Sequence, residues 1–275
     1  MNNAPIGVFD SGLGGLTVAR AIIDKLPDEE IIYLGDTANT PYGPRPIAEV
    51  RALTIDLLDA LVQQGVKMLV VACNTATAAA LSDAHERYWI RQGIPVVEVI
   101  SPAASEAAVS TRNGRIGVIG TEATVDSGAY LRALAAVPGV TVQQQACPQF
   151  VDFVERGVTT GQELMETTET YLHPLRESGV DTVILGCTHY PLLTGPVSLV
   201  MGPNVRLVAS SEATANAVYS KLVELDMLHE PRPPDQQDRP GQYRFLTTSE
   251  SPQFSHLSRR FLGPEVQQIE TLARP

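Results

Sequence analysis

The chain has 275 residues, of which 44% are apolar, and its 31 acidic and 20 basic residues leave a formal net charge of −11. This length suits one large α/β domain or two smaller ones, and the apolar content excludes a disordered chain. The acidic surplus disfavours a general nucleic-acid binder, because phosphate contacts need clustered lysine and arginine.

The composition also bears on location. No apolar run approaches the roughly 20 residues that span a bilayer, and residues 1–5 carry neither the basic nor the apolar region of a secretion signal. Three cysteines are an odd number, and two of them end apolar segments. We therefore expect no membrane association, no disulfide framework and a reducing, cytoplasmic location.

Short apolar segments alternate with helical patterns along the chain. Their β-branched content and lack of polar alternation predict strands that are covered on both faces, as in parallel α/β sheets. The predicted strands are 6–9, 31–34, 68–72, 96–99, 116–119, 141–145, 182–185 and 205–208.

The clearest helix is predicted at 47–64, where leucines and valines recur at helical spacing and Gly65 can end the helix. Ser101 before Pro102 predicts another helix start, and residues 160–163 have the form of a capping box. The proline-rich residues 230–240 predict a loop. After it, 243–247 and a helix at 251–262 form a return segment that we expect to rejoin the first part of the chain.

Two motifs recur in the same order. IGVFDSG at 6–12 resembles IGVIGTE at 116–122, and LVVACNT at 69–75 resembles VILGCTH at 183–189. The offsets are 110 and 114 residues. Chance likeness between α/β strands is one explanation. The alternative, which we favour, is two related α/β lobes, assigned to residues 1–98 with 209–275 and to residues 99–208.

Cys73 and Cys187 each stand where a predicted strand gives way to a polar turn. Ligands in open α/β sheets bind at the carboxyl ends of strands. The following residues, Asn74-Thr75 and Thr188, are of types that cap helices. A helix N-terminus lowers a thiol pKa from about 8.5, so the pattern predicts one pocket with two reactive sulfurs. Cys147 lacks this context and is expected in the core.

Two other uses of these cysteines stay open. Cys73, Cys187 and His189 could supply three ligands to zinc, although the spacing matches no common zinc motif. Cys187 and His189 could instead act as nucleophile and base in a hydrolase, which leaves Cys73 without a role.

Residues 10–15, DSGLGG, suggest a phosphate-binding loop, and Asp36 lies near where a ribose-binding acid would stand. However, Thr17 occupies the third glycine position of the dinucleotide motif. The alternative is that the glycines bring backbone N–H groups to a carboxylate at a helix start, with Asp10 supporting a cysteine or relaying a proton.

Three further features are candidates. The turn-rich loop at 39–44 can offer backbone donors and the phenol of Tyr42 to a ligand. His189, two residues from Cys187, is suited to tuning that sulfur. Glu155 ends an otherwise apolar segment and by default is a surface acid.

Together these blocks resemble the bacterial glutamate racemases of the aspartate/glutamate racemase superfamily. The resemblance covers residues 6–270 and rests on VFDSGLGG at 8–15, YLGD at 33–36, PYG at 41–43, ACNT at 72–75 and LGCTHYP at 185–191. It implies an α/β fold of two pseudo-symmetric lobes, with mainly parallel sheets flanked by helices and the active site between the lobes.

The resemblance also implies an activity, which is the cofactor-independent interconversion of L- and D-glutamate for peptidoglycan synthesis. Cys73 would take the α-proton from D-glutamate and Cys187 from L-glutamate. Asp10 would assist Cys73, and His189 and Glu155 would assist Cys187. The implied substrate-binding residues are Asp10, Ser11, Tyr42, Gly43, Asn74, Thr75, Thr121, Thr188 and His189, with Thr124 as a further candidate.

No metal, pyridoxal phosphate or nucleotide is expected to be needed. The resemblance further implies a homodimer and, from some family members, binding to DNA gyrase, without direct contact to nucleic acid. Because the first strand is predicted as early as Ile6, we expect no need for the cell-wall precursor that activates family members with a longer N-terminus.

Overall fold

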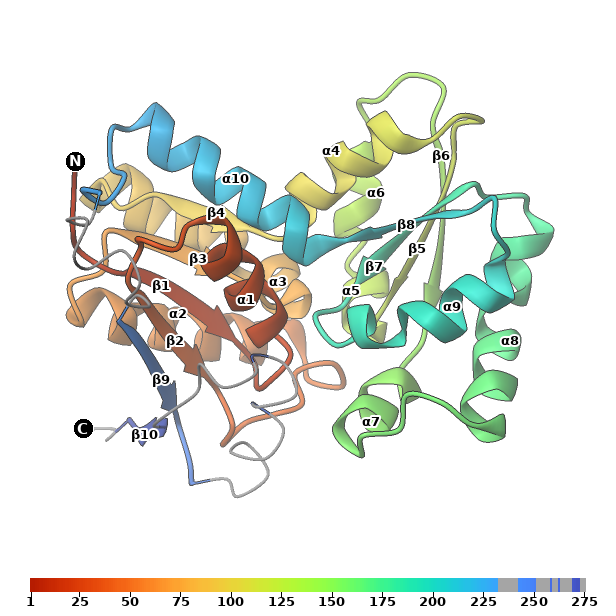
Figure 1. The fold of residues 1–275 in the computed structure, drawn as a ribbon, viewed down its shortest axis with the longest axis horizontal. Coiled ribbons are helices and arrows are strands. Elements are labelled where there is room, and N and C mark those ends of the chain that lie inside the picture. Colours follow the sequence, from red (N-terminus) through yellow and green to blue (C-terminus); the bar gives the residue numbers. More distant parts are fainter. Residues whose placement is uncertain (232–241, 251–257, 259–261, 263–268, 273–275) are drawn as a thin grey trace.

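The computed structural model describes residues 1–231, 242–250, 258, 262 and 269–272. Its strands form two separate sheets, which lie side by side in Figure 1. The N-terminus lies on the side of the first sheet. Among the described residues, no helix combines the length and the apolar character that crossing a bilayer requires.

The first sheet is entirely parallel, in the order β10-β9-β2-β1-β3-β4. Its strands are β1 (Ile6–Asp10), β2 (Ile31–Gly35), β3 (Met68–Val71), β4 (Val96–Glu98), β9 (Tyr243–Thr247) and β10 (Ile269–Thr271). The return segment at 243–247 therefore rejoins the first sheet, as expected. Of the helix predicted at 251–262, only Ser258 and Leu262 belong to the described residues, and most of the predicted loop at 230–240 lies outside them.

The second sheet is also parallel, in the order β6-β5-β7-β8. Its strands are β5 (Arg115–Gly120), β6 (Thr141–Ala146), β7 (Thr182–Gly186) and β8 (Arg206–Ala209). This order matches β2-β1-β3-β4 of the first sheet position by position. The repeated motifs thus occupy equivalent strands, β1 with β5 and β3 with β7. The lobe boundaries at 98/99 and 208/209 stay a prediction.

Helices connect and cover the strands. They are α1 (Leu16–Lys25), α2 (Ile47–Gln63), α3 (Asn74–Ala84), the π-helical η1 (His85–Ile90), α4 (Ile100–Ser110), α5 (Glu122–Asp126), α6 (Ala129–Leu134), α7 (Gln149–Glu155), α8 (Gln162–Glu177), the 3₁₀ helix η2 (Tyr190–Leu193), α9 (Thr194–Met201) and α10 (Ser210–Glu224).

Alternation along β1 explains the layers of the first lobe. Ile6 and Val8 belong to a core with α1 and α10, whereas Phe9 belongs to a second core with α2 and α3. The first of these cores continues into the second lobe. Figure 1 shows α10 leaving β8 and running back over the first sheet, where it packs against α1 and α4.

Two predicted helix starts were wrong in detail. Ser101 is not the cap of α4, because the Glu98 carboxylate accepts the N–H groups of Ile100 and Ser101 and the helix starts two residues earlier than predicted, at Ile100. At α8 the cap is Gly161 with φ of +116°, and no side chain caps the helix. The predicted end of α2 holds, since Gly65 has a φ of +77°.

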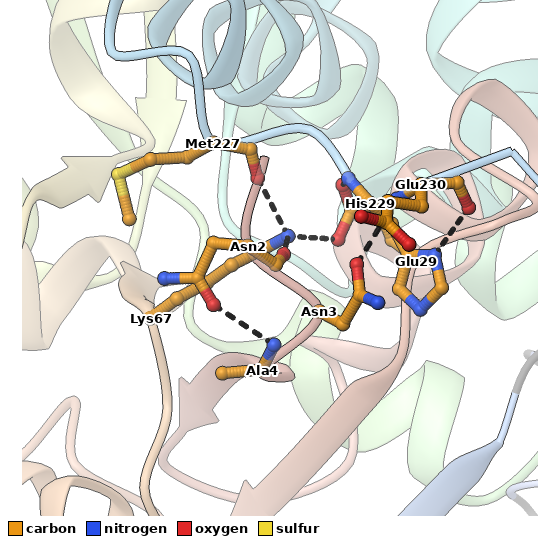
Figure 2. Close-up of polar contacts among 8 residues, drawn as sticks. All are labelled: Asn2, Asn3, Ala4, Glu29, Lys67, Met227, His229 and Glu230. Atoms are coloured by element: carbon orange, nitrogen blue, oxygen red, sulfur yellow. Dashed lines mark hydrogen bonds and ion pairs between the residues drawn. The ribbon is translucent and has the colours of Figure 1, made fainter.

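A buried ion pair lies at the amino ends of the strands of the first sheet, at the opposite end from the cysteines. Lys67 Nζ lies 2.6 Å from Glu29 Oε2, with both side chains buried, and donates to the carbonyls of Asn2 and Met227 (Figure 2). Glu29 Oε1 accepts the N–H of His229. This Lys67 network thereby ties the N-terminus to the segment that follows α10.

We expect Lys67→Met to lower the free energy of unfolding by about 3 kcal/mol or more, because it leaves the Glu29 charge buried and unpaired. Urea titration followed by circular dichroism measures this loss. In the double variant with Glu29→Gln, the added cost of the second change should be small, since the charge is gone. A cost under about 1 kcal/mol for Lys67→Met alone would contradict a network that needs its charge balance.

Candidate active site

A small enclosed pocket of about 40 Å³ lies where the two lobes meet, at the carboxyl ends of strands from both sheets. The pocket brings together both candidate cysteines and nearly every other residue that the sequence singles out. Its lining is Ser11, Thr40, Pro41, Tyr42, Gly43, Cys73, Asn74, Thr75, Thr121, Val151, Glu155, Cys187, Thr188 and His189.

Cys73 enters the pocket from the first lobe as the N-cap of α3. Its sulfur accepts the N–H of Ala76 at 3.4 Å, and its thiol donates to Ser11 Oγ at 3.3 Å. Burial, followed by the nearby Asp10 carboxyl, raises the pKa of Cys73 to about 12. The N–H at the helix start does lower this pKa, but the expected net lowering is absent, because desolvation of the thiolate outweighs the N-cap hydrogen bond.

Cys187 enters from the second lobe, directly after β7. The turn behind it leads into the short 3₁₀ helix η2, so the predicted α-helix start at Thr188 is absent there. The polar group beside the Cys187 sulfur is a side chain and not a helix N-terminus, since Cys187 Sγ lies 3.8 Å from His189 Nδ1. The opposite ring nitrogen, Nε2, lies 3.3 Å from Glu155 Oε1.

His189 is held as an imidazolium. Burial lowers its pKa, but the hydrogen bonds that His189 donates to Cys187 and Glu155 and the negative charges of these groups outweigh this effect and raise the pKa to about 10. The Nδ1 atom of this ring faces the Cys187 sulfur. Glu155 is thus more than a surface acid, because it orients this histidine from α7 while remaining partly exposed.

Asp10 is fully buried behind the pocket wall. Its Oδ2 accepts the N–H of Gly12 at 3.0 Å. Burial raises the pKa of Asp10, an effect that the charge of His189 and hydrogen bonds from the glycine loop reduce. The carboxyl lies close enough to raise the pKa of Cys73 by its charge, which fits support of that sulfur better than direct contact with a ligand.

The glycines at 12–15 serve close packing rather than a phosphate. A Cβ on Gly14 would stand 2.2 Å from Thr188 Oγ1, and one on Gly15 would stand 2.4 Å from Asp10 Cβ. Neither residue lines the pocket. The ribose-binding interpretation of Asp36 was also wrong, because Asp36 is fully buried and its carboxylate accepts hydrogen bonds from Asn39, Tyr42 and Thr248.

Asn74 presents a donor to the pocket. Its Oδ1 accepts the hydroxyl of Tyr130 from the second lobe at 2.7 Å, which fixes the orientation of the amide. Its Nδ2 is buried and has no hydrogen-bond partner among the described residues. A buried, unpaired amide donor that lines a pocket is suited to a ligand oxygen.

Hydroxyl groups join the lobes beside Asn74. Thr75 Oγ1 lies 3.0 Å from Thr121 Oγ1 and 3.3 Å from Thr124 Oγ1. Thr121 lines the pocket, whereas Thr124 lies behind it and bonds Thr121. Across the same junction, Thr17 donates to the carbonyl of Thr188.

Tyr42 and Gly43 bring the loop at 39–44 to the pocket. The phenol of Tyr42 donates to Asp36 Oδ2 at 2.7 Å, so it is not directed at a ligand as the sequence suggested. Gly43 lies against Thr121 of the other lobe, since a Cβ there would stand 3.4 Å from Thr121 Cβ. The loop therefore reaches across the lobe junction.

Sequence reasoning missed Val151 and Tyr130. Val151 lies one helical turn before Glu155 on α7, so the spacing of four residues was the available signal. No such signal was available for Tyr130, because its hydrogen-bond partner Asn74 is remote in sequence. Cys147 is buried in the core, as expected. Within the described ranges, no three histidine, cysteine or acidic side chains are arranged to share a metal ion.

Comparisons with known proteins agree with this geometry. Residues 11–218 match the family model described as Asp/Glu/Hydantoin racemase. A glutamate racemase of a Parafrankia species is 57% identical over 98% of this chain and 94% of that protein. The crystal structure of glutamate racemase isoform RacE1 from Bacillus anthracis covers 100% of this chain and 98% of its own, with a TM-score of 0.90 and 38% identity. A glutamate racemase from Francisella tularensis in complex with D-glutamate gives a TM-score of 0.90 at 32% identity, with coverage of 99% and 98%.

The unequal surroundings of the two sulfurs predict unequal alkylation. Both cysteines are similarly buried, at 5% and 6% exposure, so access differs little. At pH 7.5 we expect iodoacetamide to modify Cys187 before Cys73. Modification of Cys73 should then rise about tenfold per pH unit between pH 8 and 10, because its thiolate fraction grows at that rate below a raised pKa.

Peptide mapping by mass spectrometry measures both rates. Cys147 is the internal control and should react only after unfolding, since it is fully buried. Equal rates for Cys73 and Cys187 at neutral pH would show that the imidazolium and the burial do not separate the two thiols.

Proposed function

The chain belongs to the Asp/Glu/hydantoin racemase family, and we propose that it interconverts L- and D-glutamate by exchanging the α-proton between two cysteines. The observation that carries this proposal is that Cys73 and Cys187, from equivalent positions in two sheets, line one pocket. A hydrolase with Cys187 as its nucleophile would leave the second sulfur without a function.

Each turnover moves two protons and needs no oxidant. One sulfur, as thiolate, takes the α-proton and breaks the Cα–H bond. The electron pair remains on the α-carbon and its carboxylate, and the thiol of the other cysteine then donates its proton to the opposite face. The two sulfurs end with exchanged protonation states. A single base would have to cross the substrate between these steps, whereas two bases on different walls need not move.

The protonation states of the two cysteines in the resting enzyme are proposed to favour reaction with one of the two enantiomers. The raised pKa of Cys73 keeps it a thiol near neutral pH, and His189, whose pKa is raised to about 10, lies beside Cys187. By family resemblance Cys187 takes the proton of L-glutamate. The enzyme at rest is then ready for the L-enantiomer, with Asp10 placed to support Cys73 when the roles reverse.

Uncharged donors are suited to holding the substrate. No lysine or arginine is found among the described residues that line the pocket. The amide of Asn74 and the hydroxyls of Ser11, Thr75, Thr121 and Thr188 are proposed to bind the two carboxylates and fix the α-carbon between the sulfurs. Such preorganised donors also stabilise the negative charge that develops on the carboxylate during proton transfer.

Glutamate is proposed over aspartate because the curated relatives with 53% to 57% identity are named glutamate racemases. We further propose that the D-glutamate serves peptidoglycan synthesis in the cytoplasm, where free thiols such as the three found here persist. A homodimer and gyrase binding remain predictions from the family resemblance.

The activity itself is tested by circular dichroism time courses. We expect the signals of L-glutamate and of D-glutamate each to decay to zero, and L-aspartate to change far more slowly. In D2O the product should carry deuterium at the α-carbon, because the proton comes from a thiol that exchanges with solvent. Activity should survive dialysis against a chelator. A stable glutamate signal would refute the proposed function.

The two-base assignment is tested by replacing each cysteine. Cys73→Ala and Cys187→Ala should each lower racemisation about a thousandfold or more, since each removes an acid–base group. Serine at either position should still permit α-proton exchange or elimination on one enantiomer. Cys147→Ala is the matched control and should racemise glutamate normally. Near-normal turnover in either active-site alanine variant would exclude the two-cysteine mechanism.

A further inference from the structure

The fully buried carboxylate of Asp36 lies beside the pocket without lining it. Each of its oxygens accepts two hydrogen bonds. Oδ1 accepts from Asn39 Nδ2 at 3.0 Å and from Thr248 Oγ1 at 2.6 Å. Oδ2 accepts from Asn39 Nδ2 at 2.9 Å and from the Tyr42 hydroxyl at 2.7 Å. We name Asp36, Asn39, Tyr42 and Thr248 the Asp36 clamp.

A carboxylate is the right centre for this clamp. In all four hydrogen bonds the neighbouring residue donates and Asp36 accepts. An ionised carboxylate is the side chain that only accepts. Bonds to a charged oxygen are also stronger than those between neutral groups. An amide at this position would turn an NH₂ group toward other donors, so the clamp is specific for aspartate.

Thr248 ties the clamp to the return segment. It follows β9 directly, and its hydroxyl also accepts the N–H of Ala38 at 2.9 Å. The next residue, Ser249, exchanges hydrogen bonds with Thr37, since its N–H donates to Thr37 Oγ1 and its carbonyl accepts from that hydroxyl. A segment more than 200 residues away thus holds the turn at residues 36–39.

The turn leads directly into the part of the pocket wall formed by residues 40–43. Arg45, which follows this part of the wall, also holds the turn, because its Nε donates to the carbonyl of Asn39 at 2.8 Å. Because Gly43 packs against Thr121 of the second lobe, a shift of this loop would move one wall of the pocket relative to the other. We therefore expect the Asp36 clamp to affect the distance between the two walls of the pocket and not the cysteine sulfurs themselves.

We propose that Asp36 and Thr248 are positioning residues, which hold residues 40–43 in the geometry that binds the substrate. This inference rests on the proposed function for the identity of the substrate. It assigns the return segment a part in substrate affinity, although Thr248 itself does not line the pocket.

The test compares Thr248→Val, which keeps the shape but loses the hydroxyl, with Thr248→Ser, which keeps the hydroxyl. We expect Thr248→Val to raise KM for glutamate about tenfold with kcat changed less than twofold, and Thr248→Ser to restore the wild-type KM. Asp36→Asn should raise KM at least as much. Adding Tyr42→Phe to Asp36→Asn should cost little more, because the bond between them is already lost.

Lys67→Met is the control for stability, because the Lys67 network lies at the opposite ends of the strands. It should lower stability while leaving KM unchanged. A merely structural role of the clamp would lower the stability of Thr248→Val in the same way, without moving KM.

A second measurement does not depend on activity. Hydrogen exchange should show faster exchange of the amides of residues 38–45 in Thr248→Val than in Thr248→Ser or Lys67→Met. Unchanged exchange in this loop would overturn the inference, and so would an unchanged KM in an enzyme that racemises glutamate. A wild-type chain inactive on glutamate would refute the proposed function alone, and exchange in the loop would still decide whether the clamp holds it.

Discussion

The proposed proton exchange depends on accommodating one negative charge between two buried sulfurs. A thiolate removed from water is costly, and burial, followed by the charge of Asp10, raises the pKa of Cys73 to about 12. Parallel sheets make the arrangement feasible because all strands of a sheet end at the same edge. Two such edges meet here, and each contributes one cysteine at the end of an equivalent strand. The repeat in the chain thus suits the proposed proton transfer, which needs two similar groups facing one carbon.

The supports of the two sulfurs are nevertheless different. Cys73 has the N–H of Ala76 and the hydroxyl of Ser11, whereas Cys187 has a charged imidazole. The two enantiomers have equal free energies in water, so kcat/KM must be equal in both directions. The asymmetry of the site can then be expressed only in kcat and KM separately.

The strands of the repeat and the two cysteines at their ends could be predicted from the sequence, because periodicity and strand ends are local signals. Contacts between distant residues could not. The hydroxyl of Tyr42 donates a hydrogen bond to Asp36, and Asp36 accepts another from Thr248, which is 212 residues away from it. The pKa of Cys73 was misjudged for a related reason, since the N-cap position is local but burial depends on both lobes. Where a side chain has two plausible partners, only the packed structure decides between them.

Charge is distributed in a way that fits the exchange of roles. The buried lysine of the first lobe lies at the amino ends of the strands, paired with Glu29. At the carboxyl ends, the described lining residues offer hydroxyl and amide donors, and the imidazolium of His189 is itself balanced by Glu155. A lysine or arginine beside either sulfur would hold that cysteine permanently as thiolate. Proton transfer in both directions requires each sulfur to be both acid and base, which suits a site whose other donors are uncharged and whose one imidazolium is paired with a carboxylate.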